Sequence, residues 1–191
     1  YPSSGWGHEW VGVPGRGAGV DQPGGWIYNL LPYLEQRVLH ELGLGLAPSQ
    51  ASAASAMRLA TPISTMNCPS RRRSVARHVR DIIEIARRVG HVRSDYGINA
   101  GDRLVQQMHG PADLDDALNF AWADMTTLNG ISFLRSMVCA AHVRDGTSNT
   151  YLAGEKYLNP DHYETGLDAG DDESMYQGYC VDINRFTRPI D

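Results

Sequence analysis

Hydrophobic residues between positions 28 and 42 recur at intervals of three and four. The positions that carry this stripe are Leu31, Leu34, Val38 and Leu42. That spacing aligns apolar side chains on one face of an α-helix. Pro32 suits a first helical turn, and Gly43 is a good stop signal. The pattern therefore predicts an amphipathic helix over residues 28–42.

Two further segments have helical character. Residues 49–60 are rich in alanine, begin at a serine that can cap a helix and end before Thr61-Pro62. Residues 75–89 place an apolar stripe between charged positions. Eight arginines lie between Arg71 and Arg93, and we interpret them as a solvated helix face. Residues 63–68, between the two helices, read as a short buried strand.

Strand signals dominate the second half of the chain. Residues 95–102 are typical of a strand that enters a turn, and residues 113–122 of a short helix capped by acidic residues. Residues 131–143 and 150–153 are short β-prone runs, separated by the turn Asp145-Gly146.

Helices that precede strands indicate an α+β fold. We predict a single domain over residues 1–191, because no repeat or interdomain linker stands out. An aromatic and glycine-rich segment occupies residues 1–27, a helical region residues 28–93, and a strand-rich region with an acidic loop residues 94–191.

Composition narrows the function classes. The 191 residues are 42% hydrophobic and 20% charged, which is typical of a globular chain. No run approaches the roughly 18 to 20 apolar residues that cross a bilayer. The net charge of -5 argues against nucleic-acid binding, because phosphate contacts require a basic surface.

The three cysteines, Cys68, Cys139 and Cys180, form no CxxC pair and have no ligand spacing with a histidine. A zinc site is therefore not expected from the sequence. In an oxidising compartment any two of the cysteines can form a disulfide and leave one thiol. The alternative interpretation is three small buried hydrophobic residues.

Catalytic motifs do not appear in the sequence. It contains no GxSxG elbow, no HExxH pair and no Walker loop, and the seven histidines are scattered. We therefore predict that the protein is not an enzyme.

An acidic cluster is the first candidate site. Its members, which share a glycine-containing loop, are Asp168, Asp171, Asp172 and Glu173. Neighbouring carboxylates repel one another unless water, arginine or a cation compensates them, and calcium is the cation that oxygen ligands favour. A structural calcium ion is one interpretation, and a solvated acidic loop is the other.

An aromatic cluster is the second candidate site. Its members are Trp6, Trp10, Trp26, Tyr28 and Tyr33. Indole and phenol rings can stack on the apolar face of a sugar, so these residues are a candidate glycan-binding platform. The alternative is that they anchor the core.

Five sequence blocks carry a resemblance to a known family. They are GGWIYNLLPYLEQ (24–36), TPISTMNCPSRR (61–72), SDYGINAGD (94–102), DGTSNTYLAGEKYLNPDHY (145–163) and GDDESMYQG (170–178). Together they resemble the planctomycete family called domain of unknown function 1559, which is also catalogued as solute-binding-protein-like. Residues 74–93 match no pattern of the family, and we interpret them as a member-specific insertion.

The resemblance implies a pilin-like or pseudopilin-like head with N-terminal helices and a C-terminal antiparallel sheet. It also implies a prepilin-like leader and an anchoring hydrophobic helix before Tyr1, absent from this sequence. The expected location is extracytoplasmic, at the cell surface or in the periplasm. The expected role is a non-catalytic surface or fibre subunit that associates with itself or with related pilin-like subunits, and contacts the membrane only through that helix. The alternative is a cell-surface solute- or carbohydrate-binding module.

Overall fold

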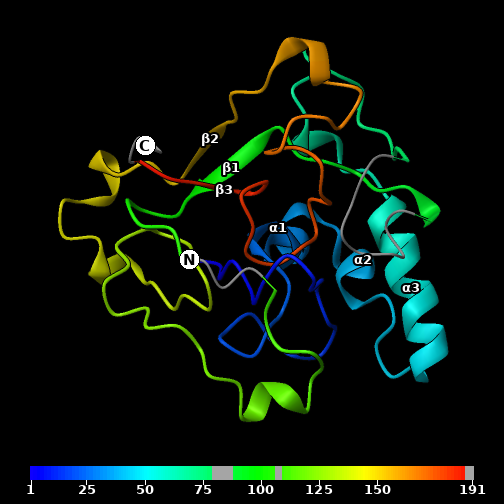
Figure 1. Ribbon diagram of the computed structural model, residues 1–191, viewed down its shortest axis with the longest axis horizontal. Coiled ribbons are helices and arrows are strands. Elements are labelled where there is room, and N and C mark those ends of the chain that lie inside the picture. The colour runs from blue at the N-terminus through cyan, green and yellow to red at the C-terminus, as the bar shows by residue number, and fades with distance from the viewer. Residues whose placement is uncertain (79–87, 106–108, 188–191) are drawn as a thin grey trace.

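The computed structural model describes residues 1–78, 88–105 and 109–187. Most of this chain is loop, organised around short helices and a small sheet (Figure 1). Helix α1 (Trp26–Leu30) lies at the centre, and α2 (Arg37–Glu41) and α3 (Pro48–Ala60) lie together at one edge. The mixture of helices and a sheet agrees with the predicted α+β class. Within the described ranges, no helix combines the length and apolarity needed to cross a bilayer.

The prediction of one continuous helix over residues 28–42 is wrong. The segment forms α1, a 3-10 turn (Leu31–Leu34) and α2. Glu35 ends the turn in the left-handed region with φ 60°, which breaks the run of helical hydrogen bonds. The chain then folds back, so that the Tyr28 hydroxyl donates to the carbonyl of His40.

Helix α3 confirms the second predicted helix, and it ends before Thr61-Pro62 as expected. The predicted serine cap is wrong, because Ala47 is the N-cap and Pro48 opens the first turn. Arg58 joins α3 to α2. Its buried guanidinium donates to the carbonyls of Gly12, Leu39 and Leu42, and the last two are groups that the end of α2 leaves unpaired.

The sheet has the strand order β2-β1-β3. Strand β1 (Tyr96–Asn99), which confirms the strand predicted within 95–102, pairs antiparallel with β2 (Ala153–Glu155). It pairs parallel with β3 (Asn184–Arg185). The expectation of a purely antiparallel sheet is therefore wrong. The parallel partner is a two-residue strand from the C-terminal segment, whose pattern is too short to be recognised in the sequence.

Two other predicted strands do not form. Residues 63–68 contain a 3-10 turn (Ser64–Met66), whose apolar residues enter the core without a strand partner. Residues 131–143 form loops and a 3-10 turn (Ala140–His142), because Arg135 adopts φ 52° and bends the chain. The short helix predicted over 113–122 is reduced to a 3-10 turn (Asp116–Leu118), whose N-cap Asp115 makes no side-chain capping bond. The Asp113 carboxylate instead accepts from the amides of Asp115 and Asp116 just before the turn. The helix predicted over 75–89 lies largely outside the described residues.

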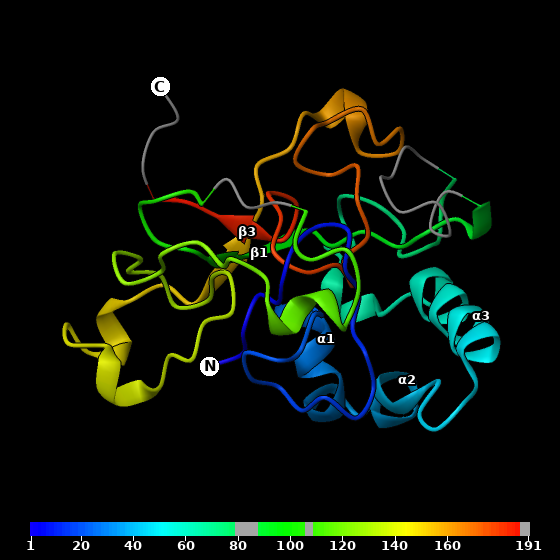
Figure 2. The same ribbon diagram turned by 60° about the horizontal axis from the view of Figure 1, so that its bottom comes forward.

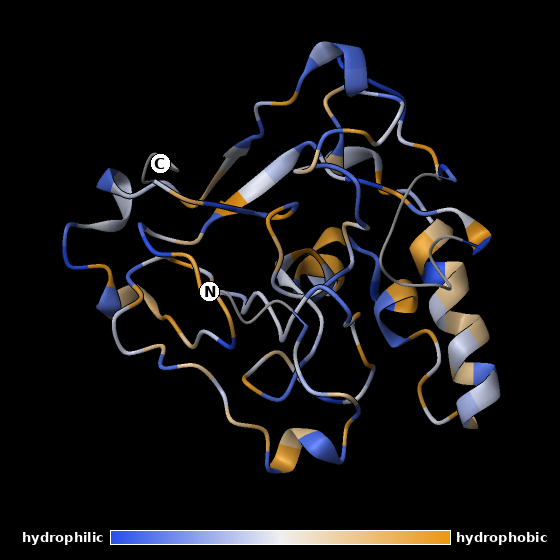
Figure 3. Ribbon diagram, in the orientation of Figure 1, coloured by the Kyte–Doolittle hydropathy of each residue, from blue (hydrophilic) through white to orange (hydrophobic). Residues whose placement is uncertain are grey.

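The core lies between α1 and the sheet (Figures 2 and 3). Ile27 and Leu31 pack there with Ile98 of β1 and with Tyr176 and Ile183 of the C-terminal segment, all at most 1% exposed.

The glycine-rich N-terminal segment permits unusually close packing on this core. A Cβ on Gly24 would lie 2.4 Å from Cα of Gly12, and a Cβ on Gly12 would overlap the ring of Tyr28. Glycine is therefore required where these two loops meet.

Candidate functional site

The structure does not bring the five aromatic residues of the predicted glycan platform onto one exposed face, although the rings of Trp6 and Trp10 are in contact. Trp6, Trp26 and Tyr28 are 1%, 3% and 0% exposed, whereas Tyr33 is 83% exposed on the 3-10 turn. The indole nitrogens of Trp6 and Trp26 donate to the carbonyls of Val20 and Ile183. These rings are core anchors in the described structure, and a buried ring offers no face to a ligand.

The acidic segment contains one buried carboxylate, Asp171. Its Oδ1 lies 2.9 Å from Nη2 of Arg72 and 2.9 Å from Nζ of Lys156. Its Oδ2 lies 2.8 Å from Nη1 of Arg93 and also pairs with Nη1 of Arg72. Three cationic groups therefore compensate a single carboxylate that is 1% exposed.

The two buried arginines correct the prediction of a solvated arginine face, since Arg72 and Arg93 are 6% and 4% exposed. Both lie outside the apolar stripe, and their partner Asp171 is 99 and 78 residues away in the chain. Such a separation cannot be recognised from helical periodicity.

A second buried carboxylate, Asp95, extends the network. Its Oδ1 forms an ion pair of 2.8 Å with Arg72, and its Oδ2 accepts from the amide of Cys68. Lys156, the only lysine in the chain, also donates to the carbonyls of Gly170 and Asp182. The sequence blocks 61–72, 94–102, 145–163 and 170–178 thus converge on one buried charged centre.

Burial and charge act in opposite directions on this network. Burial acts to raise the pKa of Asp171, but hydrogen bonds from Arg72 and the nearby cations outweigh it, so that the pKa is lowered. Burial lowers the pKa of Lys156. Asp182 lacks a comparable set of partners, and burial raises its pKa to about 7. The buried charged centre therefore links distant segments of the chain, and its charge state depends on pH.

The predicted calcium ligands do not gather around one point. Asp168 accepts hydrogen bonds from the amides of Asn159 and Gly170, and Asp171 is neutralised by its three cations. Calcium binding by Asp168, Asp172 and Glu173 stays a prediction.

All three cysteines are free thiols. Cys139 is exposed, Cys68 is half-buried and Cys180 is buried. Burial raises the pKa of the Cys180 thiol well above its ordinary value, which keeps it in the unreactive protonated form. The structure therefore favours separate thiols over a disulfide.

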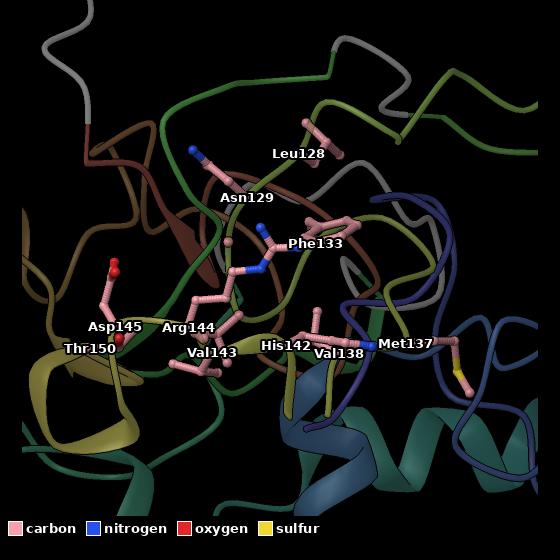
Figure 4. Close-up of a pocket in the computed structure, with 12 residues that line it drawn as sticks. Leu128, Asn129, Phe133, Met137, Val138, His142, Val143, Arg144, Asp145 and Thr150 are labelled. Atoms are coloured by element: carbon pink, nitrogen blue, oxygen red, sulfur yellow. The ribbon is translucent and has the colours of Figure 1, made fainter. Parts of the chain in front are cut away.

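An open pocket with a volume of about 530 Å³ lies among the loops of residues 128–150 (Figure 4). Asp145 and Thr150 lie at one end and Met137 at the other, and the Arg144 side chain extends between them toward Phe133. This pocket contains none of the predicted site residues. Sequence reasoning missed it because it treated residues 131–143 as a β-prone run, whereas these residues form loops around the pocket.

Two groups in the pocket can donate to a ligand. Nδ1 of His142 accepts from the amide of Cys139 at 3.2 Å, which leaves the other ring nitrogen, Nε2, as the N–H donor. Arg144 is exposed and has no ion-pair partner in the described part of the chain. With the ring of Phe133 beside them, these donors suit a small ligand that carries an anionic group and an apolar face.

The family model SBP_bac_10, described as "Protein of unknown function (DUF1559)", matches residues 1–179. No curated protein and no solved structure matches the chain. The family match covers all the sequence blocks that converge on the buried charged centre.

Proposed function

This chain belongs to the DUF1559 family, and from that premise we propose that it is a non-catalytic, pseudopilin-like subunit of an extracytoplasmic surface structure or fibre. It associates with copies of itself or with related pilin-like subunits. In this proposal the charged centre keeps a loop-rich head rigid, and the exposed surface makes the contacts with neighbouring subunits.

Exposed apolar side chains on the helical edge carry the proposal. Val38 on α2 is 83% exposed, Met57 on α3 is 63% exposed, and Leu44 in the connecting loop is 56% exposed. Exposed apolar side chains on two helices that lie together, and on the loop between them, favour a protein contact. A partner that covers them would gain hydrophobic stabilisation of about 25 cal/mol for each Å² buried.

The test combines cell fractionation with light scattering and native mass spectrometry of the purified protein. We expect fractionation to recover it outside the cytoplasm and purified samples to form concentration-dependent oligomers. The double variant Val38→Glu/Met57→Glu should dissociate them, because two charges would enter the apolar contact. Leu118→Glu is the matched control, since Leu118 is 81% exposed on a different loop. A protein that is monomeric at every concentration and cytoplasmic in the cell would refute the proposal.

The pocket supports a second candidate function, a cell-surface module that binds solutes or carbohydrates. The solute-binding-type name of the family model is consistent with it. Because Arg144 is a cation at the pocket with no ion-pair partner among residues 1–78, 88–105 and 109–187, acidic ligands are favoured over neutral ones.

Glucuronate and glucose are suitable probes of the pocket, because they differ mainly by a carboxylate. We expect glucuronate, but not glucose, to raise the melting temperature, and Arg144→Gln to abolish the rise. Arg103→Gln, a change at an arginine whose side chain is 61% exposed, should retain it. An equal response of wild type and Arg144→Gln would refute binding at this pocket.

A further inference from the structure

A second cluster of polar side chains lies between the N-terminal segment and residue 109. Nε2 of His8 and Nδ1 of His109 are 3.3 Å apart, and Oε1 of Glu9 lies 2.8 Å from the same Nδ1. One ligand atom from each of the three residues lies within 4.8 Å of the others. We propose that His8, Glu9 and His109 form a binding site for a divalent transition metal, with zinc as its simplest occupant.

The separation of the two ring nitrogens matches a shared metal ion. Zinc binds histidine nitrogen at about 2.0–2.1 Å, so two nitrogens on one tetrahedral zinc lie about 3.3 Å apart. Oε1 of Glu9 lies 2.8 Å from Nδ1 of His109 and would move by about half an ångström to reach the same spacing from that nitrogen, and its side chain is 46% exposed. Two histidines and one carboxylate are a ligand set that catalytic zinc and non-haem iron sites use.

Hydrogen bonding alone satisfies the cluster poorly. Nδ1 of His109 faces both Glu9 and His8, yet a neutral ring nitrogen either carries one proton or accepts one. If Nδ1 of His109 carries the proton, then Glu9 and His8 must share it as two acceptors. If Nδ1 of His109 instead accepts a hydrogen bond from His8, then the lone pair on this nitrogen faces the negative Glu9 carboxylate. A cation in the middle would use all three lone pairs at once.

A second carboxylate lies beside the other ring nitrogen of His8. Nδ1 of His8 lies 3.5 Å from Oε1 of Glu173, and both side chains are 13% exposed. A carboxylate behind one ring nitrogen holds the proton there and directs the other nitrogen toward a metal, as in many metal sites. The His8 carbonyl also accepts from Nε2 of Gln177 at 2.7 Å, which fixes the backbone.

Trp10 brings the two distant segments together. Its indole nitrogen donates to the carbonyl of Pro111 at 2.9 Å, and its ring packs on Trp6 with a centroid distance of 4.8 Å. His109 therefore lies beside His8 although 101 residues separate them. The sequence contains no ligand spacing for this reason.

The site keeps one side open. The side chain of His109 is 69% exposed, so water, a small ligand or a side chain of another molecule can occupy a remaining coordination position. Three protein ligands with an open position distinguish such a site from a closed structural zinc site with four.

The test is isothermal titration calorimetry of the purified chain with zinc chloride, followed by visible absorption spectroscopy of the chain loaded with cobalt(II). We expect one zinc per chain, and cobalt bands that zinc displaces and calcium does not. His8→Ala and His109→Ala should each weaken zinc binding by tenfold or more, and Glu173→Gln by about tenfold because it acts through His8. His162→Ala, which removes a histidine outside both candidate sites, should leave the affinity unchanged.

His109→Ala also controls for folding. Because this imidazole is largely exposed, we expect the variant to keep the wild-type circular dichroism and metal-free melting temperature. Zinc should then raise the melting temperature of wild type but not of this variant. Absence of zinc binding to wild type, or equal affinity of wild type, His8→Ala and His109→Ala, would overturn the proposal and leave a hydrogen-bonded cluster only.

Discussion

Asp171→Asn is the substitution that most directly tests the buried charged centre. The change keeps the size of the side chain but removes the negative charge that faces Arg72, Arg93 and Lys156. Asp95 pairs with Arg72, whereas Lys156 and Arg93 lose their closest carboxylate. Buried positive charge would remain without compensation.

The expected cost is large compared with the stability of a domain. Removal of one partner from a buried ion pair destabilises a protein by about 3–5 kcal/mol, against a total free energy of unfolding of about 5–15 kcal/mol. We expect Asp171→Asn to lower the unfolding free energy by about 3–5 kcal/mol. The matched control is Asp168→Asn in the same loop, where the carboxylate accepts from two backbone amides. Asparagine keeps one of these acceptors, so this change should cost only about 1 kcal/mol, less than loss of the buried charge.

Urea denaturation monitored by tryptophan fluorescence and circular dichroism measures both values. The pH dependence supplies a second signature. Because the pKa of Asp171 is lowered in the folded state, its contribution is present above the ordinary aspartate pKa and is lost as the pH falls through the lower folded value. Asp171→Asn should remove this acid-dependent loss. A variant within about 1 kcal/mol of wild type, with an unchanged acid limb, would refute the role assigned to the network.

Three further predictions follow from other buried groups and from the acidic loop. Burial raises the pKa of Asp182 to about 7, so the protonated side chain contributes to stability below about pH 4. This contribution to the unfolding free energy, on the order of 4 kcal/mol, is lost as the pH rises to about 7. Asp182→Asn should therefore flatten the plot of unfolding free energy against pH between about pH 4 and 7. Arg58→Met should lower the unfolding free energy by about 2–4 kcal/mol in urea titrations, because three carbonyls lose their donor; no change would show that water replaces the guanidinium. If Asp168, Asp172 and Glu173 bind calcium, calcium should raise the melting temperature of wild type but not of Asp172→Ala, and an unchanged wild type would eliminate the site.

Local signals in the sequence determined several elements. The alanine content of residues 49–60 was sufficient to predict helix α3, and Thr61-Pro62 was sufficient to predict its end. Both signals are local because the formation and termination of a helix depend on neighbouring residues. The β-prone residues of 95–102 were sufficient to predict strand β1. The five sequence blocks were sufficient to identify the family, which the match over residues 1–179 confirms.

Tertiary structure alone decided how the charged and aromatic residues are used. In the sequence Asp171 belongs to an acidic loop. In the structure it is buried against three cations from distant segments and is part of the buried charged centre. Trp26 and Tyr28 are buried as core anchors because Trp26 donates to the carbonyl of Ile183, and the Tyr28 ring packs against Gly12 and stacks on His40. The contact between His8 and His109 joins residues that are 101 positions apart. Periodicity within a short stretch of sequence carries no information about which distant side chains will share a low-dielectric interior or a metal ion.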